Sequence, residues 1–193
     1  MKKFLILAIL VTFILGVSPS LNAQSRNCVS KISLSVGAGI RNFSSSLYKD
    51  VYGDSPTTYN ADLGFRLSNI FEAFVHTDYL KVDGQTTYTH DTTTLKILPA
   101  EVGLRLLLPV TKGCKFVILP YLGGGAGYYM IKEESAIGTV DEKRTGFFFE
   151  GGLRIYIMKP VFIDLKAKDV MLKSKSDVNL GGFTYQGGIG ISF

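Results

Sequence analysis

Apolar side chains alternate with small or polar ones along much of this chain, and no other feature restricts its fold as strongly. In the segment 31–41 every even position from Ile32 to Ile40 is apolar, while the odd positions hold lysine, serine, glycine and arginine. Successive side chains of a strand point to opposite faces of a sheet, so a period of two predicts strands. The same pattern predicts further strands at 58–68, 71–79, 98–108, 147–157, 161–168 and 183–193. Segment 115–131 is also expected to be a strand, but its glycine run gives too little contrast to assign its faces.

The connections between these eight segments alternate in length. Short ones surround Ser68-Asn69, 109–114 and 158–160, and long ones cover 44–56, 81–94, 132–143 and 174–181. Membrane barrels have short periplasmic turns and longer external loops. We therefore predict an all-β fold, an eight-stranded antiparallel up-and-down transmembrane β-barrel, with both chain ends on the side of the short turns.

The first residues have the layout of a secretory signal peptide. Lys2 and Lys3 precede an apolar run from Phe4 to Val17, and small and polar residues follow it. The run is shorter than the roughly 20 residues that a transmembrane helix needs. We predict a signal peptide at 1–23 and one barrel domain at 24–193.

Alternation alone does not decide whether such a barrel is soluble or embedded in a membrane, because the apolar face points inward in one and outward in the other. Side chains as large as Phe147, Phe149 and Ile155 are too bulky to fill together the narrow interior of eight strands. The charged and glycine-rich face fits that interior better. A soluble periplasmic ligand-binding β-barrel is the alternative.

With the charges turned inward, each buried ion needs a partner. Pairing Ile157 with Val161 around one short turn, and Leu67 with Phe71 around another, sets two hairpin registers that bring opposite charges together on the inner face. The predicted lumen ion pairs are Arg154 with Asp164, Glu150 with Lys168, Arg66 with Glu72, and Asp62 with a protonated His76.

Three stretches resemble a known family. They are the signal peptide ending at Ala23-Gln24, the run Leu119 to Tyr128, and the terminal strand Gly188 to Phe193. The chain is similar to the outer-membrane β-barrel domain of Bacteroidetes-like bacteria, and more distantly to the small OmpA-like and OmpX-like barrels. The resemblance implies a location in the cell outer membrane, contact with its lipid, and insertion by the barrel-assembly machinery through a signal at Gly188, Ile191 and Phe193.

Composition argues against several classes of function. Without Lys2 and Lys3 the chain has 19 basic and 16 acidic side chains, so the net charge falls from +5 to +3, and the basic residues are too dispersed to indicate a nucleic-acid partner. The two histidines, His76 and His90, do not combine with the two cysteines into a convincing metal site. No phosphate-binding or dinucleotide motif occurs, so we expect no cofactor.

The function predicted from these features is a non-enzymatic structural or surface-interaction role for a monomer with a salt-bridged lumen. The alternatives are a narrow passive pore and a lipid A-modifying enzyme that uses His76. An extracellular partner would contact the long loops. Cys28 and Cys114 are both expected at the periplasmic rim, but whether they form a disulfide stays open, because the first and fifth strands stand on opposite sides of the barrel.

Overall fold

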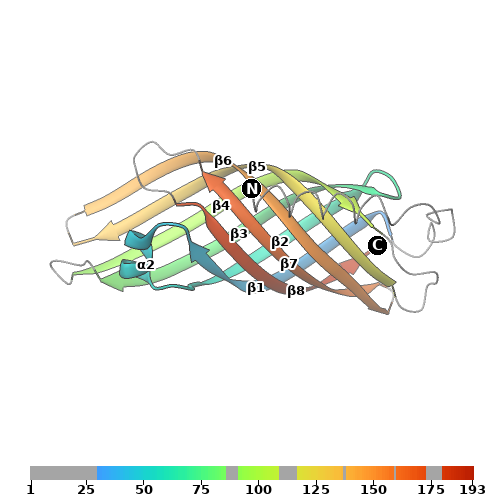
Figure 1. Cartoon of the computed structure of the whole chain (residues 1–193), viewed down its shortest axis with the longest axis horizontal. Coiled ribbons are helices and arrows are strands. Elements are labelled where there is room, and N and C mark those ends of the chain that lie inside the picture. Colours follow the sequence, from blue (N-terminus) through green and yellow to red (C-terminus); the bar gives the residue numbers. More distant parts are fainter. Residues whose placement is uncertain (1–29, 86–90, 109–116, 137, 159, 173–179) are drawn as a thin grey trace, which may run out of the picture.

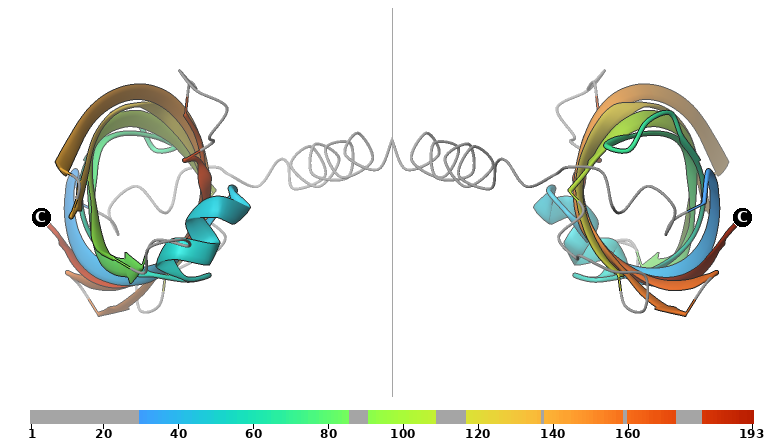
Figure 2. Two further views of the ribbon diagram at one scale, coloured as in Figure 1. Left: turned by 90° about the vertical axis from the view of Figure 1, so that its left-hand side faces the viewer. Right: turned by 90° about the vertical axis from the view of Figure 1, so that its right-hand side faces the viewer.

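The computed structural model describes residues 30–85, 91–108, 117–136, 138–158, 160–172 and 180–193. Eight strands form one closed antiparallel barrel in chain order, and the last strand pairs with the first (Figures 1 and 2). This is the predicted fold. The elements are β1 (Ile32–Phe43), α2 (Ser46–Tyr52), β2 (Thr57–Arg66), β3 (Phe71–Gln85), β4 (Thr92–Leu107), β5 (Val117–Ser135), β6 (Gly138–Met158), β7 (Val161–Leu172) and β8 (Gly182–Ser192).

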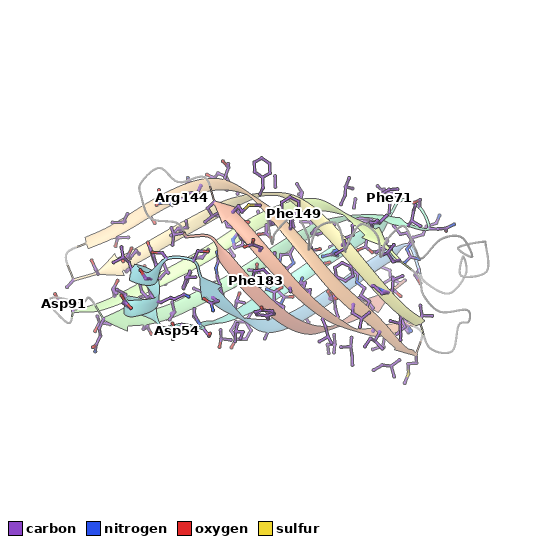
Figure 3. The ribbon with its side chains drawn as sticks, in the orientation of Figure 1. Asp54, Phe71, Asp91, Arg144, Phe149 and Phe183 are labelled. Atoms are coloured by element: carbon purple, nitrogen blue, oxygen red, sulfur yellow. The ribbon has the colours of Figure 1, made fainter. Side chains whose placement is uncertain are left out.

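The apolar side chains point away from the barrel and the charged ones point into it. Phe71, Phe149 and Phe183 project from the outer surface (Figure 3), with 45%, 62% and 41% of their area exposed. Glu72, the neighbour of Phe71, is buried in the lumen. In β5, whose faces the sequence left unassigned, Tyr121 and Tyr129 are buried and Tyr128 is exposed. A soluble barrel would have the opposite arrangement.

Glycines allow close approach between β4 and β5. Gly103 lies opposite Gly125 in the ladder. A Cβ atom on Gly125 would overlap the carbonyl oxygen of Val102 and stand 2.7 Å from the Cα of Gly103. Glycine is therefore required at this point of the wall, because any side chain would push two paired strands apart.

Strands β3, β4, β5 and β6 continue beyond the described pairing with β2 and β7 on either side of them. Two sequence predictions are wrong in this region. The connections predicted at 81–94 and 132–143 are largely strand, since ladder pairs continue from Lys81 with Lys96 to Gln85 with Thr92, and from Ile131 with Glu142 to Ser135 with Gly138. Described pairing of β2 with β3 stops at Leu80, and that of β7 with β6 begins at Gly146. Residues 81–85, 92–97, 131–135 and 138–145 thus form a sheet beyond the barrel rim, named here the projecting sheet (Figure 1).

The connection at 44–56 is also not a simple loop, because it contains the short helix α2. Tyr52 of this helix is buried, and Tyr48 and Val51 pack beside it on the barrel interior. At the opposite end, the turn after β2 keeps the predicted Leu67–Phe71 hydrogen bond, with a nitrogen-to-oxygen distance of 2.9 Å. The predicted Ile157–Val161 pair is wrong by one residue, since a bulge there pairs Met158 with Val161.

Several predictions fall outside the described residues. They are the signal peptide 1–23, the turn 109–114, and the cysteines Cys28 and Cys114 with the disulfide between them; His90 falls there too. Within the ranges described above, no helix combines the length and the apolar character needed to cross a bilayer.

Replacing Gly125 with alanine should destabilise the barrel by about 1–3 kcal/mol, because the added methyl group overlaps β4. Gly151 provides the matched control, since the atom nearest to a Cβ added at this glycine belongs to the flexible Leu122 side chain, at 3.2 Å. Gly151→Ala should be neutral or slightly stabilising through the unfolded chain. Urea unfolding of both variants in detergent micelles measures the difference, and equal midpoints would contradict the close-approach explanation.

Candidate functional site

A group of charged side chains fills the middle of the lumen. We name it the ionic core, and each member has 7% or less of its area exposed. Its acidic members are Asp62, Glu72, Asp78, Glu101, Glu150 and Asp164, and its basic members are Arg105, Arg154, Lys166, Lys168 and His76. Isolated ions at such positions would be very costly, so the arrangement of partners decides whether the barrel is stable.

Arg105 of β4 donates hydrogen bonds to more carboxylates than any other described side chain in the ionic core. Its Nη1 and Nη2 donate to the two oxygens of Asp62 at 2.8 and 2.5 Å, and Nη1 also donates to Glu72 at 3.0 Å. Its Nε donates to Glu150. The guanidinium lies 3.7 Å from the centre of the Phe74 ring. A planar group with five donors can satisfy three carboxylates at once, which a lysine could not do with the same geometry.

Arg154 of β6 forms the second bidentate contact. Its two terminal nitrogens donate to the carboxylate of Glu72 at 2.7 and 2.9 Å. Its Nε lies 3.7 Å from Asp164, which accepts a hydrogen bond from the Tyr121 hydroxyl at 2.9 Å. Glu72 is therefore shared by two arginines, and the strands β3, β4 and β6 are linked across the lumen.

His76 lies among carboxylates and lysines on the side of the ionic core toward α2. Its Nδ1 is 3.2 Å from Asp62 and 3.1 Å from the ammonium of Lys166, and its Nε2 is 3.1 Å from Asp78. Lys168 donates to Asp78 and, at 2.8 Å, to Glu101. The Tyr129 hydroxyl donates to the other oxygen of Glu101 at 2.7 Å.

His76, Asp78 and Glu101 present donor atoms within 4.8 Å of one another, a composition that suits a divalent metal. The ammonium of Lys168 donates to both carboxylates of this group. It therefore supplies the positive charge that a metal would bring, and we interpret the group as part of the ion-pair network. His76 has 1% of its area exposed and faces the lumen, where no lipid substrate reaches it.

Apolar side chains close the lumen on both sides of the ionic core. Toward α2 lies the mouth cluster, which contains Phe43, Tyr52, Phe74, Leu80, Leu95, Ile97, Tyr129, Ile131, Phe148, Val170, Leu172 and Leu180. Toward the short turns lies the base cluster of Leu107, Val117, Leu119, Tyr121, Tyr156 and Phe162. Water would have to cross two apolar layers and an ion-paired polar layer to pass through the barrel.

The helix α2 is attached to the mouth cluster by polar contacts as well as by packing. The Tyr52 hydroxyl donates to Glu133 at 2.7 Å and lies 3.1 Å from the Thr93 hydroxyl. Burial and the carboxylate of Glu133 raise the pKa of Tyr52 above its ordinary value, so the phenol stays protonated and remains a donor. The helix thereby binds β4 and β5 within the projecting sheet.

The predicted charged residues all lie where the registers placed them, but several bind other partners. Arg154 is opposite Asp164, Glu150 opposite Lys168, Arg66 opposite Glu72 and Asp62 opposite His76. Of these, Asp62 and His76 are in hydrogen-bond contact, and Arg154 and Asp164 form an ion pair with a nitrogen-to-oxygen distance of 3.7 Å. Glu150 instead pairs with Arg105, and Lys168 with Asp78 and Glu101. Among the described contacts, Arg66 has no ion pair to Glu72, which is bound by Arg154 and Arg105. In so narrow a barrel, long side chains reach across the lumen as easily as along the wall.

Four members of the ionic core were not assigned partners from the sequence. They are Asp78, Glu101, Arg105 and Lys166. Strand parity places all four on the inner face, so a signal for their burial was present. Their partners could not be derived, because the long β3–β4 connection and the glycine run of β5 left the registers on both sides of β4 undetermined.

The residues of the predicted assembly signal lie on the closing strand. Ile191 and Phe193 are exposed on the outer surface, and Gly188 lies opposite Gly37 of β1. Phe193 and Ile32 exchange backbone hydrogen bonds of 2.9 and 3.0 Å, which complete the seam between the last and first strands. The reading of these residues by an assembly machinery remains a prediction.

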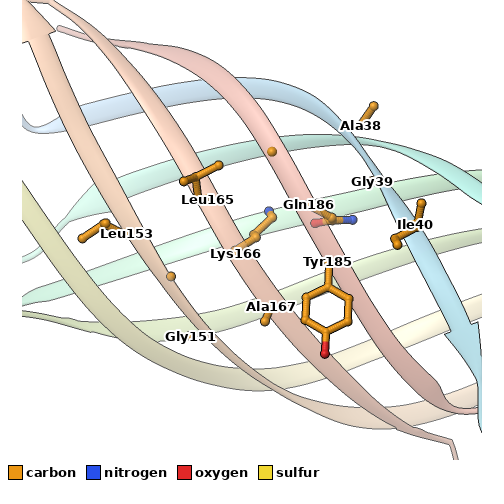
Figure 4. Close-up of a pocket in the computed structure, with 12 residues that line it drawn as sticks. Ala38, Gly39, Ile40, Gly151, Leu153, Leu165, Lys166, Ala167, Tyr185 and Gln186 are labelled. Atoms are coloured by element: carbon orange, nitrogen blue, oxygen red, sulfur yellow. The ribbon is translucent and has the colours of Figure 1, made fainter.

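The outer surface carries shallow apolar hollows. One of about 570 Å³ lies over β6, β7, β8 and β1 where small residues such as Ala38, Gly151 and Ala167 leave space beside Leu165 and Tyr185 (Figure 4). A second of about 700 Å³ lies over β4 to β7, lined by Ala100, Ala126, Tyr128, Thr145 and Phe147 among others.

Replacing Arg105 with methionine should destabilise the barrel by about 3–5 kcal/mol, because Asp62, Glu72 and Glu150 would lose their shared cation while remaining buried. Exchanging the exposed Lys81 for methionine is the control, and it should change stability by no more than about 0.5 kcal/mol. Samples of each variant are heated in SDS to increasing temperatures and run on a gel, where the folded barrel differs in mobility from the unfolded chain. The temperature at which the folded band disappears compares the stabilities of the two variants. If the unfolding temperature of Arg105→Met shifts as little as that of the control, the ionic core contributes little to the stability of the barrel.

Comparison with known proteins gives the same architecture. The structure superposes on Neisserial surface protein A with a TM-score of 0.66 at 14% identity, over 84% of this chain and 97% of that one. It superposes on OprG from Pseudomonas aeruginosa with a TM-score of 0.62 at 15% identity, over 86% and 96%. For Ail of Yersinia pestis in complex with the heparin analogue sucrose octasulfate the TM-score is 0.58 at 16% identity, over 86% and 99%. At these identities the likeness concerns the fold alone.

Comparison with curated protein sequences gave no match. The family model described as outer membrane protein beta-barrel domain matches residues 8–193. This match excludes the soluble periplasmic barrel considered above, and the apolar outer surface agrees with it. The chain therefore belongs to the outer membrane protein β-barrel domain family, and its barrel lies in the outer membrane.

Proposed function

We propose that this protein is a non-catalytic surface-interaction barrel, whose lumen is closed and whose contacts with other molecules are made outside the cell by the projecting sheet. The observation that carries the proposal is the pairing of β3 to β6 beyond the rim, which presents a sheet where long loops were expected. With the short turns on the periplasmic side, this sheet extends from the cell surface.

The closed lumen argues against a pore. The mouth and base clusters exclude water at both ends of the ionic core, and Arg105 and Arg154 hold the carboxylates of the core in bidentate contacts. An eight-stranded barrel has room for side chains but not for an additional aqueous path. Burial of His76 between Asp62 and Asp78 likewise argues against a lipid-modifying enzyme, whose base would have to reach a lipid outside the barrel.

The free edge of the projecting sheet suits a contact with another molecule. In β6 the described pairing with β7 begins at Gly146, so within the described residues the segment 139–143 has a ladder partner on β5 only. Such an edge presents backbone donors and acceptors to an extended segment of a partner. Asp141 and Lys143, both exposed, limit nonspecific edge-to-edge pairing.

A closed lumen predicts that the purified protein forms no steady channel in planar bilayers. The double variant Glu72→Ala with Arg154→Ala removes an ion pair without changing net charge, and it should stay closed as well, because the mouth and base clusters remain. Single-channel recording compares the two proteins at the same protein-to-lipid ratio. Stable conductance of the unaltered protein, equal to that of the double variant, would favour the pore.

A surface-interaction role predicts that adherence depends on the β5–β6 part of the projecting sheet. Deleting 134–139 and joining the ladder partners Glu133 and Val140 through Asn-Gly should reduce attachment of bacteria to immobilised matrix and serum proteins to the level of cells without the protein. The double variant of the lumen is the matched control, because its outer surface is unchanged. The comparison is made at equal amounts of folded barrel, measured by its change in gel mobility on heating. Attachment that persists after the deletion would argue against this role.

A further inference from the structure

Lysines form a row on the outward face of the projecting sheet. Lys81 lies opposite Lys96, and Lys96 opposite Lys132, on the neighbouring strands β3, β4 and β5. Lys143 of β6 faces the same way and is exposed. Like charges directly opposite one another destabilise a sheet. Glu134 offsets part of this cost for Lys96 and Lys132, and a bound anion would offset it further.

The charges on this face are ordered by distance from the apolar surface of the barrel. Each lysine of β3, β5 and β6 has a carboxylate two positions farther out on the same strand, namely Asp83, Glu134 and Asp141, and β4 has Thr94 there. The lysines thus stand nearest the membrane, just beyond the outward residues Tyr79, Leu98 and Met130. Aromatic side chains followed by cations match the order of apolar chains and headgroups in a leaflet.

The 700 Å³ hollow lies directly below three of these lysines. Its residues Ala100, Tyr128 and Thr145 belong to the strands that carry Lys96, Lys132 and Lys143. The lysine stands four positions from the hollow on β4 and on β5, about 13 Å along the strand, and two positions from it on β6, about 7 Å. Lysine side chains bend toward a charged interface, which shortens this gap.

We propose that Lys96, Lys132 and Lys143 and the hollow beneath them form a binding site for one phosphorylated lipid of the outer leaflet, with a phosphate on the lysines and an acyl chain in the hollow. Neither part alone would define the site, because lysines are common on surfaces and hollows occur elsewhere on the barrel. Their position on the same three strands combines a place for a charged headgroup with a place for an acyl chain.

The other hollow lacks this combination. Its β7 lining residue Ala167 is followed two positions later by Asp169, which lies between Phe149 and Phe183 on the outer face. A carboxylate there repels a phosphate. Asp169 also stands two positions from Met171, a residue of β7 at the edge of the proposed hollow. The three lysines stand on β4, β5 and β6 instead, in the projecting sheet.

Glu134 competes for two of the proposed lysines. Its carboxylate lies 2.9 Å from the ammonium groups of both Lys96 and Lys132. The hydrogen bonds from Lys132 and Lys96 lower the pKa of Glu134 to about 2, so it is ionised at neutral pH. Asp141 lies directly opposite Lys132 and is a second carboxylate on this face, so the three lysines face two carboxylates and one positive charge remains for a phosphate. Removing Glu134 should therefore strengthen lipid binding.

Native mass spectrometry of the purified protein in non-ionic detergent tests the site with diphosphoryl lipid A as the probe and phosphatidylcholine as the zwitterionic comparison. Lipid A should bind in preference, and millimolar inorganic phosphate should not displace it. Each of Lys96→Gln, Lys132→Gln and Lys143→Gln should weaken binding about fivefold. Ala126→Phe, which fills the hollow, should weaken it without changing charge, and Glu134→Gln should strengthen it.

Matched controls lie outside the site. Lys49→Gln removes a lysine of α2, and Ala73→Phe adds a ring to the outer face of β3 outside the hollow, so both should bind lipid A as the unaltered protein does. Equal binding of the two lipids, or unchanged binding by the lysine variants, would overturn the proposal. Heparin is the probe for an acidic polysaccharide. If the lysine variants lose heparin binding and Ala126→Phe leaves lipid A binding unchanged, the lysines bind an acidic polysaccharide instead of a lipid. These outcomes are independent of the adherence assay.

Discussion

Pairing of buried charges across a narrow lumen is the constraint on which the rest of this structure depends. Eight strands enclose too little space for water to solvate six carboxylates, so each of them must find a cation or a donor inside the barrel. Arg105 and Arg154 meet this requirement by linking carboxylates from β2, β3 and β6. The same contacts connect strands that are not neighbours in the wall, which supports the barrel from within.

The proposed closure of the ion-paired interior assigns the contacts of the protein with other molecules to its outer surfaces. The inner face of the projecting sheet holds α2 through Glu133 and Thr93, whereas its outer face carries lysines close to the membrane. Ion pairs here are exposed and exchange with solvent, so each is weaker than a pair in the lumen. Weak, exposed charges suit reversible binding, while the buried pairs suit permanent structure.

Strand parity and the alternation of turns were sufficient to predict the barrel, because both arise from local geometry. The same holds for the registers that place Arg154 opposite Asp164 and Asp62 opposite His76, which follow from short hairpins. The partners of Glu150 and Lys168 did not follow, since Arg105 and Asp78 approach them across the lumen. The extent of β3 to β6 was missed for another reason. Beyond the rim the outward face is charged while Leu95, Ile97 and Ile131 turn inward to the mouth cluster, so the phase of the alternation reverses and the strand no longer continues the pattern of the barrel wall.

The projecting sheet links the two roles suggested for the outer surface. Lys132 and Glu133 are adjacent on β5, and alternation in the strand turns the first toward the membrane surface and the second toward α2. A lipid headgroup held by Lys132 would therefore fix the strand that anchors α2 and pairs with the free edge of β6. Membrane contact on one face thus orients the edge that faces the exterior, because a sheet transmits position through its ladder more rigidly than a loop does.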